Sequence, residues 1–87
     1  MYKFYIEFYR ENDGEYILQS RFYDTAEGVY GFLKQIDYIE IGINYGLALM
    51  LVRVSDEGEY SIEYGERINP YISLEDLRDI CEKLKNN

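Results

Sequence analysis

A strict alternation of side chains over residues 2–10 is typical of only one kind of local structure. One side of this stretch carries Tyr2, Phe4, Ile6 and Phe8, and the other carries Lys3, Tyr5, Glu7 and Tyr9. A period of two with aromatic and β-branched residues predicts a β-strand. The pair Asp13-Gly14 then favours a tight hairpin turn, because glycine adopts a positive φ without steric cost. We therefore expect residues 15–23 to return as a second strand, with Tyr16, Leu18, Ser20 and Phe22 on one face.

Helical periodicity replaces this alternation after residue 23. Asp24 is expected to cap a helix, with Glu27 three residues later at the capping-box position. The apolar stripe expected to be buried consists of Ala26, Val29, Tyr30, Leu33 and Ile36. In the stretch 37–46, Gly42 and Gly46 interrupt the alternating isoleucines, which argues for a bend or bulge. Residues 38–45 therefore stay open between a strand, a loop and part of a binding surface.

The second half of the chain repeats this order of elements. Residues 47–54 are almost continuously apolar, which predicts a strand in the centre of the sheet. After a turn at residues 56–58, we expect a fourth strand with Tyr60, Ile62 and Tyr64 inward and Glu59, Ser61 and Glu63 outward. Ser73 then caps a second helix, with Asp76 at the capping-box position. The stripe expected to be buried consists of Leu74, Leu77, Ile80, Cys81 and Leu84.

These elements predict an α+β fold in β-β-α-β-β-α order. The economical arrangement is a four-stranded, mainly antiparallel sheet with two helices packed on one face. Eighty-seven residues leave room for one core, so residues 1–87 are expected to form a single domain. The apolar fraction of 47% is that of a globular protein and excludes a disordered acidic tail.

Net charge indicates which class of partner to expect, and the cysteine content and the N-terminal residues indicate the compartment. Seventeen acidic residues against nine basic ones give a net charge of −8, which repels phosphate backbones and anionic membranes. We therefore expect a basic protein as the partner, with no direct binding to nucleic acid or membrane. The single cysteine, Cys81, cannot form an internal disulfide, and the N-terminal residues do not resemble a signal peptide. The expected location is the cytoplasm.

We recognise no catalytic or metal-binding motif in the sequence. The chain has no histidine, which removes the commonest general base and the commonest transition-metal ligand. Cys81 lies on the apolar side of the second helix, where a free cysteine acts as a small hydrophobe. The loops around Gly14 and Gly58 lack the ligand spacing of a calcium-binding EF-hand. We expect no enzyme activity, no cofactor and no metal.

Two acidic clusters and one strand face remain as candidate binding sites. The first hairpin tip carries Glu11, Asp13 and Glu15, and the second carries Asp56, Glu57 and Glu59. Glu63 shares the expected outer face of the fourth strand, and Tyr5, Glu7 and Tyr9 share that of the first. With helices on only one side of the sheet, the other side is expected to present tyrosines and carboxylates to solvent. The alternative interpretation is that the acids serve only solubility and the tyrosines only strand formation.

In size, acidity and lack of catalytic groups, the chain resembles the small anti-CRISPR and other anti-defence proteins of phages and mobile elements. The resemblance covers the character of the whole chain and no sequence motif. It implies an inhibitor in the cytoplasm of a bacterial or phage-infected cell. Such an inhibitor binds a basic, nucleic-acid-handling protein, such as a nuclease or a CRISPR effector, by imitating the charge of DNA or RNA. The alternative function is a homo-oligomeric structural or interaction module, such as a homodimer, that pairs through its Tyr-rich sheet face or an edge strand.

Overall fold

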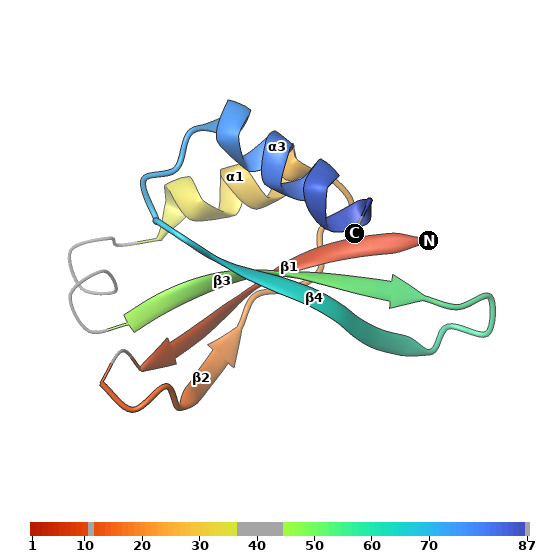
Figure 1. The fold of residues 1–87 in the computed structure, drawn as a ribbon, viewed down its shortest axis with the longest axis horizontal. Coiled ribbons are helices and arrows are strands. Elements are labelled where there is room, and N and C mark those ends of the chain that lie inside the picture. The colour runs from red at the N-terminus through yellow and green to blue at the C-terminus, as the bar shows by residue number, and fades with distance from the viewer. Residues whose placement is uncertain (11, 37–44, 87) are drawn as a thin grey trace.

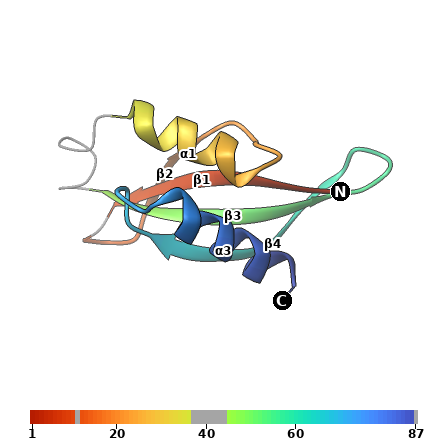
Figure 2. The ribbon, with the colours of Figure 1, turned by 90° about the horizontal axis from the view of Figure 1, so that it is seen from above.

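A computed structural model describes residues 1–10, 12–36 and 45–86. Its strands and helices are β1 (Tyr2–Arg10), β2 (Tyr16–Gln19), α1 (Ala26–Gln35), β3 (Tyr45–Val54), β4 (Tyr60–Ile68) and α3 (Leu74–Lys85). The strands form one antiparallel sheet in the order β2-β1-β3-β4, and both helices lie on the same side of it (Figure 1, Figure 2). The predicted α+β class, a four-stranded antiparallel sheet with two helices on one face, is confirmed.

The strand predicted to be central is confirmed as β3. It pairs with β1 on one side and β4 on the other, and both of its faces are covered. Leu51 on the helix side and Val52 on the opposite side are each 1% exposed. Burial on both faces explains why this stretch is almost continuously apolar. Within the stretch 37–46, whose conformation the sequence left open, only Tyr45 and Gly46 are among the described residues, and they begin β3.

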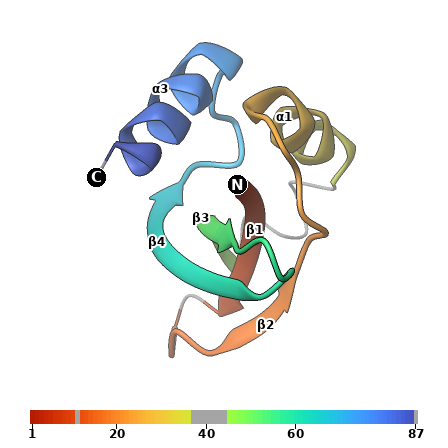
Figure 3. The same cartoon turned by 90° about the vertical axis from the view of Figure 1, so that its right-hand side faces the viewer.

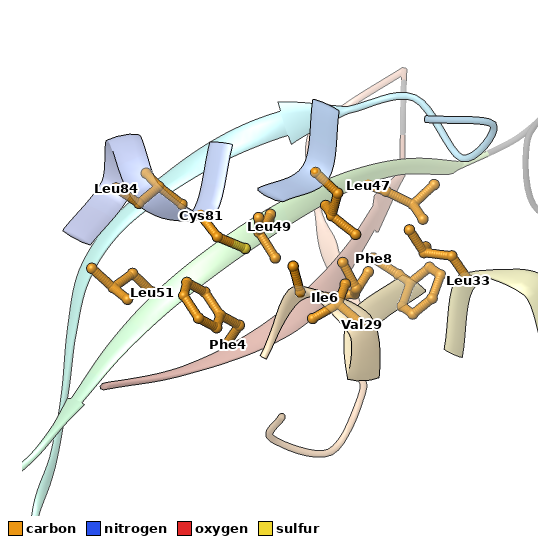
Figure 4. Close-up of a cluster of buried hydrophobic side chains, with 12 residues drawn as sticks. Phe4, Ile6, Phe8, Val29, Leu33, Leu47, Leu49, Leu51, Cys81 and Leu84 are labelled. Atoms are coloured by element: carbon orange, nitrogen blue, oxygen red, sulfur yellow. The ribbon is translucent and has the colours of Figure 1, made fainter. Parts of the chain in front are cut away.

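The main hydrophobic core fills the space between the sheet and the helices (Figure 4). Its buried side chains are Phe4, Ile6 and Phe8 of β1, Leu47, Leu49 and Leu51 of β3, Ala26, Val29 and Leu33 of α1, and Leu77, Cys81 and Leu84 of α3. The partly buried residues of the two helical stripes, Tyr30, Ile36, Leu74 and Ile80, pack against its margin. Burial of one large apolar side chain stabilises a fold by about 1.5–3 kcal/mol. Both predicted stripes are therefore confirmed.

The first helix has a different cap from the one predicted. Thr25, not Asp24, is the N-cap, and its Oγ1 accepts a hydrogen bond from the backbone N–H three residues later at 3.2 Å. Asp24 instead forms an ion pair with Lys3 of β1 at 2.7 Å. The predicted capping box is also wrong, because Glu27 binds Arg78 of α3 at 2.6 Å. The second helix begins as predicted, with the Ser73 Oγ accepting a hydrogen bond from Asp76 N at 3.1 Å.

The second strand is shorter than the predicted range of residues 15–23. It ends at Gln19, because the next residue uses its side chain to bind β1. The Ser20 Oγ accepts a hydrogen bond from Ile6 N at 2.9 Å and donates one to the Arg21 carbonyl at 2.8 Å. Pairing resumes only as a single bridge between Phe4 and Tyr23.

The residues expected on one face of this segment lie on both faces. Leu18 is paired with Phe8, whose side chain belongs to the main core on the helix side. The ring of Phe22 instead lies 5.5 Å from that of Tyr5, on the side away from the helices. The expected shared face is therefore wrong, because the chain leaves the regular strand at Ser20.

Seen along its long axis, the sheet is strongly curled (Figure 3). β4 curves beneath β3 toward β2, although β4 and β2 are the two opposite edges of the sheet. The ring of Tyr60 in β4 lies 5.0 Å from that of Phe22, which follows β2. The far half of the β3–β4 hairpin therefore closes part of the sheet face that the helices leave uncovered.

Candidate protein-binding surface

The two acidic hairpin tips lie at opposite ends of the molecule. Tyr2 is paired with Arg53 at one end of the β1–β3 ladder, and Arg10 is paired with Tyr45 at the other. The β1–β2 turn extends from the second of these ends and the β3–β4 turn from the first, as Figure 1 shows. The molecule measures 38 Å along its longest axis. The acids of the two tips therefore do not form one compact surface.

Arg10 forms ion pairs with the acids of the first tip that the structure describes. Its Nη1 lies 3.2 Å from Asp13 Oδ2 and 3.3 Å from Glu15 Oε2. Asp13 Oδ1 also accepts a hydrogen bond from Glu15 N at 2.9 Å, which stabilises the turn. Glu11 lies outside the described residues. Turn formation thus accounts for Asp13 and Glu15 without a partner protein.

The acids of the second tip have no such cation. Asp56, Glu57 and Glu59 are exposed, and none of them forms an ion pair within the described ranges. The turn that carries them is well fixed. The Ser55 Oγ accepts a hydrogen bond from Glu59 N at 3.1 Å, the Ser55 carbonyl accepts one from Gly58 N at 2.9 Å, and Gly58 has a φ of 83°. Three like charges are therefore held close together on a protruding turn.

A β-bulge in β4 determines which side chains lie beside this tip. Leu51 of β3 is paired with Tyr64 and the next residue of β3 with Ile62, so Glu63 is an extra residue. Because Leu51 belongs to the main core, Tyr64 lies on the helix face, whereas Tyr60 and Ile62 lie on the opposite face. Tyr60 and Ile62 are each 62% exposed, and Tyr64 is 43% exposed. The prediction that all three point inward is wrong, since the bulge breaks the alternation and these side chains lie exposed on an edge strand.

Glu63 lies in different surroundings from the acids of the tip. Its Oε1 accepts a hydrogen bond from the Ser61 hydroxyl at 3.2 Å. It also borders a surface depression together with Arg53 and Lys85. These two cations offset part of the local negative charge, so Glu63 contributes less to an anionic surface than the tip does.

Tyr5 is not presented to solvent, contrary to the prediction. Its side chain is 2% exposed and packs beneath the ring of Phe22. Its hydroxyl donates a hydrogen bond to Glu7 Oε2 at 3.4 Å. The ring of Phe22 contacts those of Tyr5 and Tyr60, and we call these three aromatic residues the minor cluster. Tyr5 therefore stabilises the fold and does not contact a partner from this position.

Tyr9 joins two strands across the middle of the sheet. Its ring lies over Gly46 of β3, where a Cβ atom would collide with it. The Arg67 guanidinium of β4 lies 5.0 Å from the ring centroid, and its Nε donates a hydrogen bond to the Tyr9 hydroxyl. Tyr9 and Glu7 are both partly buried. The predicted Tyr-rich face is thus largely occupied by contacts within the protein.

One compact binding surface remains from these candidates. It combines the three acids of the second tip with the two exposed apolar residues that follow them, and we refer to it as the tip surface: Asp56, Glu57, Glu59, Tyr60 and Ile62. Sequence reasoning identified the acids but placed Tyr60 and Ile62 inside the protein. Their exposure follows from the bulge and from the edge position of β4. Exposed carboxylates beside apolar side chains on a fixed turn suit a cationic protein surface.

The remaining candidates for a functional role are the cysteine and the metal-ligand residue types. Cys81 is buried in the main core, and this burial raises the pKa of its thiol to about 11. In the part of the chain that the structure describes, no group of three His, Cys, Asp or Glu side chains is placed to hold a metal ion. Nor is any helix of that part long and apolar enough to cross a membrane.

Comparisons with protein-family models, with curated proteins and with solved structures found no match to this chain. The chemistry of its own surface therefore carries the functional inference.

Proposed function

We propose that the protein is a small acidic inhibitor that binds a basic, nucleic-acid-handling protein in the cytoplasm of a bacterial or phage-infected cell. The observation that supports this function is the tip surface, where three carboxylates that pair with no cation of the described residues adjoin two largely exposed apolar side chains. Carboxylates on a protruding turn match in charge the phosphates that a nucleic-acid-binding site accepts. Anti-CRISPR and other anti-defence proteins are inhibitors of this type.

The net charge and the tip surface act at different stages of binding. A net charge of −8 accelerates the encounter with a basic site. This acceleration weakens with salt, because the Debye length is only about 8 Å at physiological ionic strength. Once the partner is in contact, Tyr60 and Ile62 lose exposed apolar area, which contributes about 25 cal/mol per Å². The charges thus set the association rate and the choice of partner, whereas the apolar contact slows dissociation.

Other acids of the described chain are less suited to this role. Arg10 pairs with both described acids of the first tip, and Glu27 binds Arg78 between the two helices. Glu75 and Asp76 stand in the first turn of α3, where their charge complements the helix dipole. Structural requirements account for these acids, and none of comparable strength accounts for the acids of the second tip.

Affinity capture from a bacterial lysate with a matched pair of variants tests the proposed function. Glu57→Lys/Glu59→Lys reverses two charges at the tip, and Glu75→Lys/Asp79→Lys reverses two on α3. Each pair adds twice +2 to the net charge of −8 and leaves −4. We expect the wild type and the α3 variant to capture a nucleic-acid-binding protein that about 0.5 M salt or competing duplex DNA releases. The tip variant should lose it.

The captured protein must then be inhibited. After purification, it should lose nucleic-acid binding or cleavage when the wild-type chain is added, and keep them when the tip variant is added. Equal capture by the tip variant, or full activity of the captured protein in the complex, would contradict the proposed function.

Self-association is the second candidate function, and the exposure of Tyr60 and Ile62 favours it. A second copy of the chain would cover these side chains through the edge of β4. Because Tyr5 is buried and Ile62 is exposed, the variant that tests this function is made in the fourth strand. Light scattering should then give the mass of a dimer that high salt leaves intact and that Ile62→Lys converts to a monomer. A monomer at every salt concentration would exclude this function.

A further inference from the structure

The edge strand β4 is open to pairing with another chain. All of residues 60–65 are exposed, and among the described strands β4 pairs with β3 alone. The opposite edge of the sheet, β2, has four residues. An edge strand presents unpaired N–H and C=O groups, to which a strand of another protein can add.

The hydrogen-bond register shows which residues have these free backbone groups. Ser55 N donates to the Glu59 carbonyl at 2.9 Å, so this is a hydrogen-bonded pair of the β3–β4 ladder. Such pairs alternate with pairs that are not hydrogen-bonded. The pairs that Tyr60 and Ile62 form with β3 are therefore not hydrogen-bonded. Their N–H and C=O groups point away from β3, toward the free edge.

We propose that an extended basic segment of the partner adds to this edge as a fifth strand at Tyr60–Ile62. The inference rests on the proposed function and names how the partner binds. Lys or Arg side chains of the added strand would lie near Asp56, Glu57 and Glu59, and its apolar side chains would lie beside Tyr60 and Ile62. Charge favours this occupant over a second copy of the chain, because a second copy carries the same net charge of −8.

The bulge at Glu63 limits how much of β4 can take part. A bulge breaks the regular spacing of backbone groups along an edge and increases the local twist. A regular strand can therefore pair with Tyr60 and Ile62 but not continue unchanged past Glu63. Short edges of this kind resist indiscriminate pairing. Binding then requires the acids of the tip in addition to the backbone hydrogen bonds.

Two synthetic hexapeptides of identical composition test strand addition. The probe is acetyl-Lys-Val-Lys-Val-Lys-Val-amide, and its control has the same residues with alternating L and D configuration. The control keeps the charge but cannot place its side chains alternately on the two sides of an ordinary strand. Binding to the full, isotope-labelled chain is followed by amide chemical shifts and by hydrogen exchange. We expect the all-L peptide to bind at least about tenfold more tightly and to slow exchange of the Tyr60 and Ile62 amides.

Each outcome decides between strand addition and another mode of binding. Equal binding of the two peptides overturns strand addition and leaves the charge-based docking of the proposed function intact. Binding of neither peptide also overturns it, whereas the capture experiment above tests the proposed function independently. Slow exchange of both amides without peptide, increasing with protein concentration, would assign the edge to a second copy.

A pair of protein variants provides a further check. Ile62→Pro removes an N–H that makes no hydrogen bond within the sheet, and Ile62→Ala keeps that N–H while removing most of the side chain. Strand addition predicts weaker binding of the all-L peptide to the Pro variant than to the Ala variant. Equal affinities for two folded variants would contradict it.

Discussion

Replacing Phe22 with alanine would measure how much the curled sheet contributes to stability. Its ring lies 5.5 Å from that of Tyr5 and 5.0 Å from that of Tyr60. An aromatic pair contributes about 0.5–1.5 kcal/mol beyond the buried area, so the two pairs together contribute about 1–3 kcal/mol. Replacing a fully buried Phe with Ala costs about 3–5 kcal/mol, and Phe22 is only partly buried. We expect Phe22→Ala to lower the free energy of unfolding by about 2–3 kcal/mol.

Urea unfolding followed by circular dichroism and tyrosine fluorescence measures this change, since the chain contains no tryptophan. For a domain of this size, the expected loss corresponds to a decrease in Tm of about 10–20 °C. Leu18→Ala is the matched control, because Leu18 is 52% exposed on β2 and its truncation should cost less than about 1 kcal/mol. A loss below about 0.5 kcal/mol for Phe22→Ala would refute a stabilising role for the minor cluster.

Three further predictions concern single groups. Burial raises the pKa of Cys81 to about 11, so its thiol should react with a disulfide reagent near pH 8 only as fast as the protein opens. Rapid labelling of the native chain would contradict the place of Cys81 in the core. The hydrogen bond from Arg78 should hold the pKa of Glu27 below its ordinary value of 4.5, and Arg78→Gln should return it toward 4.5 in a carboxyl NMR titration. Since this pKa is lowered in the folded state, the contribution of Glu27 to stability is present above about pH 4.5 and is lost as the pH falls through the folded pKa. Ser20→Ala should cost about 1–3 kcal/mol, because it leaves the buried Ile6 N–H without its acceptor, and an unchanged urea midpoint would argue against this.

The parts of the fold predicted correctly are those that depend on local periodicity. The alternation of Phe4, Ile6 and Phe8 places them on one face of β1, and the helical spacing of Leu77, Cys81 and Leu84 places them on one side of α3. These patterns suffice because each face meets a continuous apolar layer. The choice between Thr25 and Asp24 as the cap could not be made locally, since both residue types cap well. Asp24 is instead bound by Lys3, a residue distant in sequence.

The incorrect predictions of side-chain exposure share one cause. A pattern of alternating residues describes a flat strand. It states which residues share a face, but not whether that face curls over or stays open. Tyr5 is buried because the chain after β2 and the far end of β4 bring Phe22 and Tyr60 together above it. Tyr60 and Ile62 are exposed because β4 is an edge and is interrupted at Glu63. Strand order and bulges depend on contacts between distant segments, which the pattern of one segment does not contain.

The difference between the two acidic tips depends on the structure, because each tip follows an arginine in the sequence. Arg10 directly precedes the first turn, and the structure shows it binding both Asp13 and Glu15. The nearest cation before the second turn is Arg53, which is paired with Ser61 and whose guanidinium lies 5.9 Å from the centroid of the Tyr2 ring. Counting nearby cations would therefore not have distinguished the two tips, because Arg53 precedes Asp56 by the same three residues by which Arg10 precedes Asp13. Only the sheet register adds that the two tips lie at opposite ends of the molecule.

The minor cluster also bears on how the tip surface binds. Tyr60 belongs to the tip surface and, through Phe22, is connected to Tyr5 in the interior. This contact fixes the position of the hairpin before any partner arrives, so that less conformational entropy is lost on binding. The exposed half of Tyr60 and its free backbone groups are thereby presented in one orientation beside the acids. The curl that removes Tyr5 from the predicted binding face thus also fixes Tyr60 beside the acids, which is the arrangement that the proposed function requires.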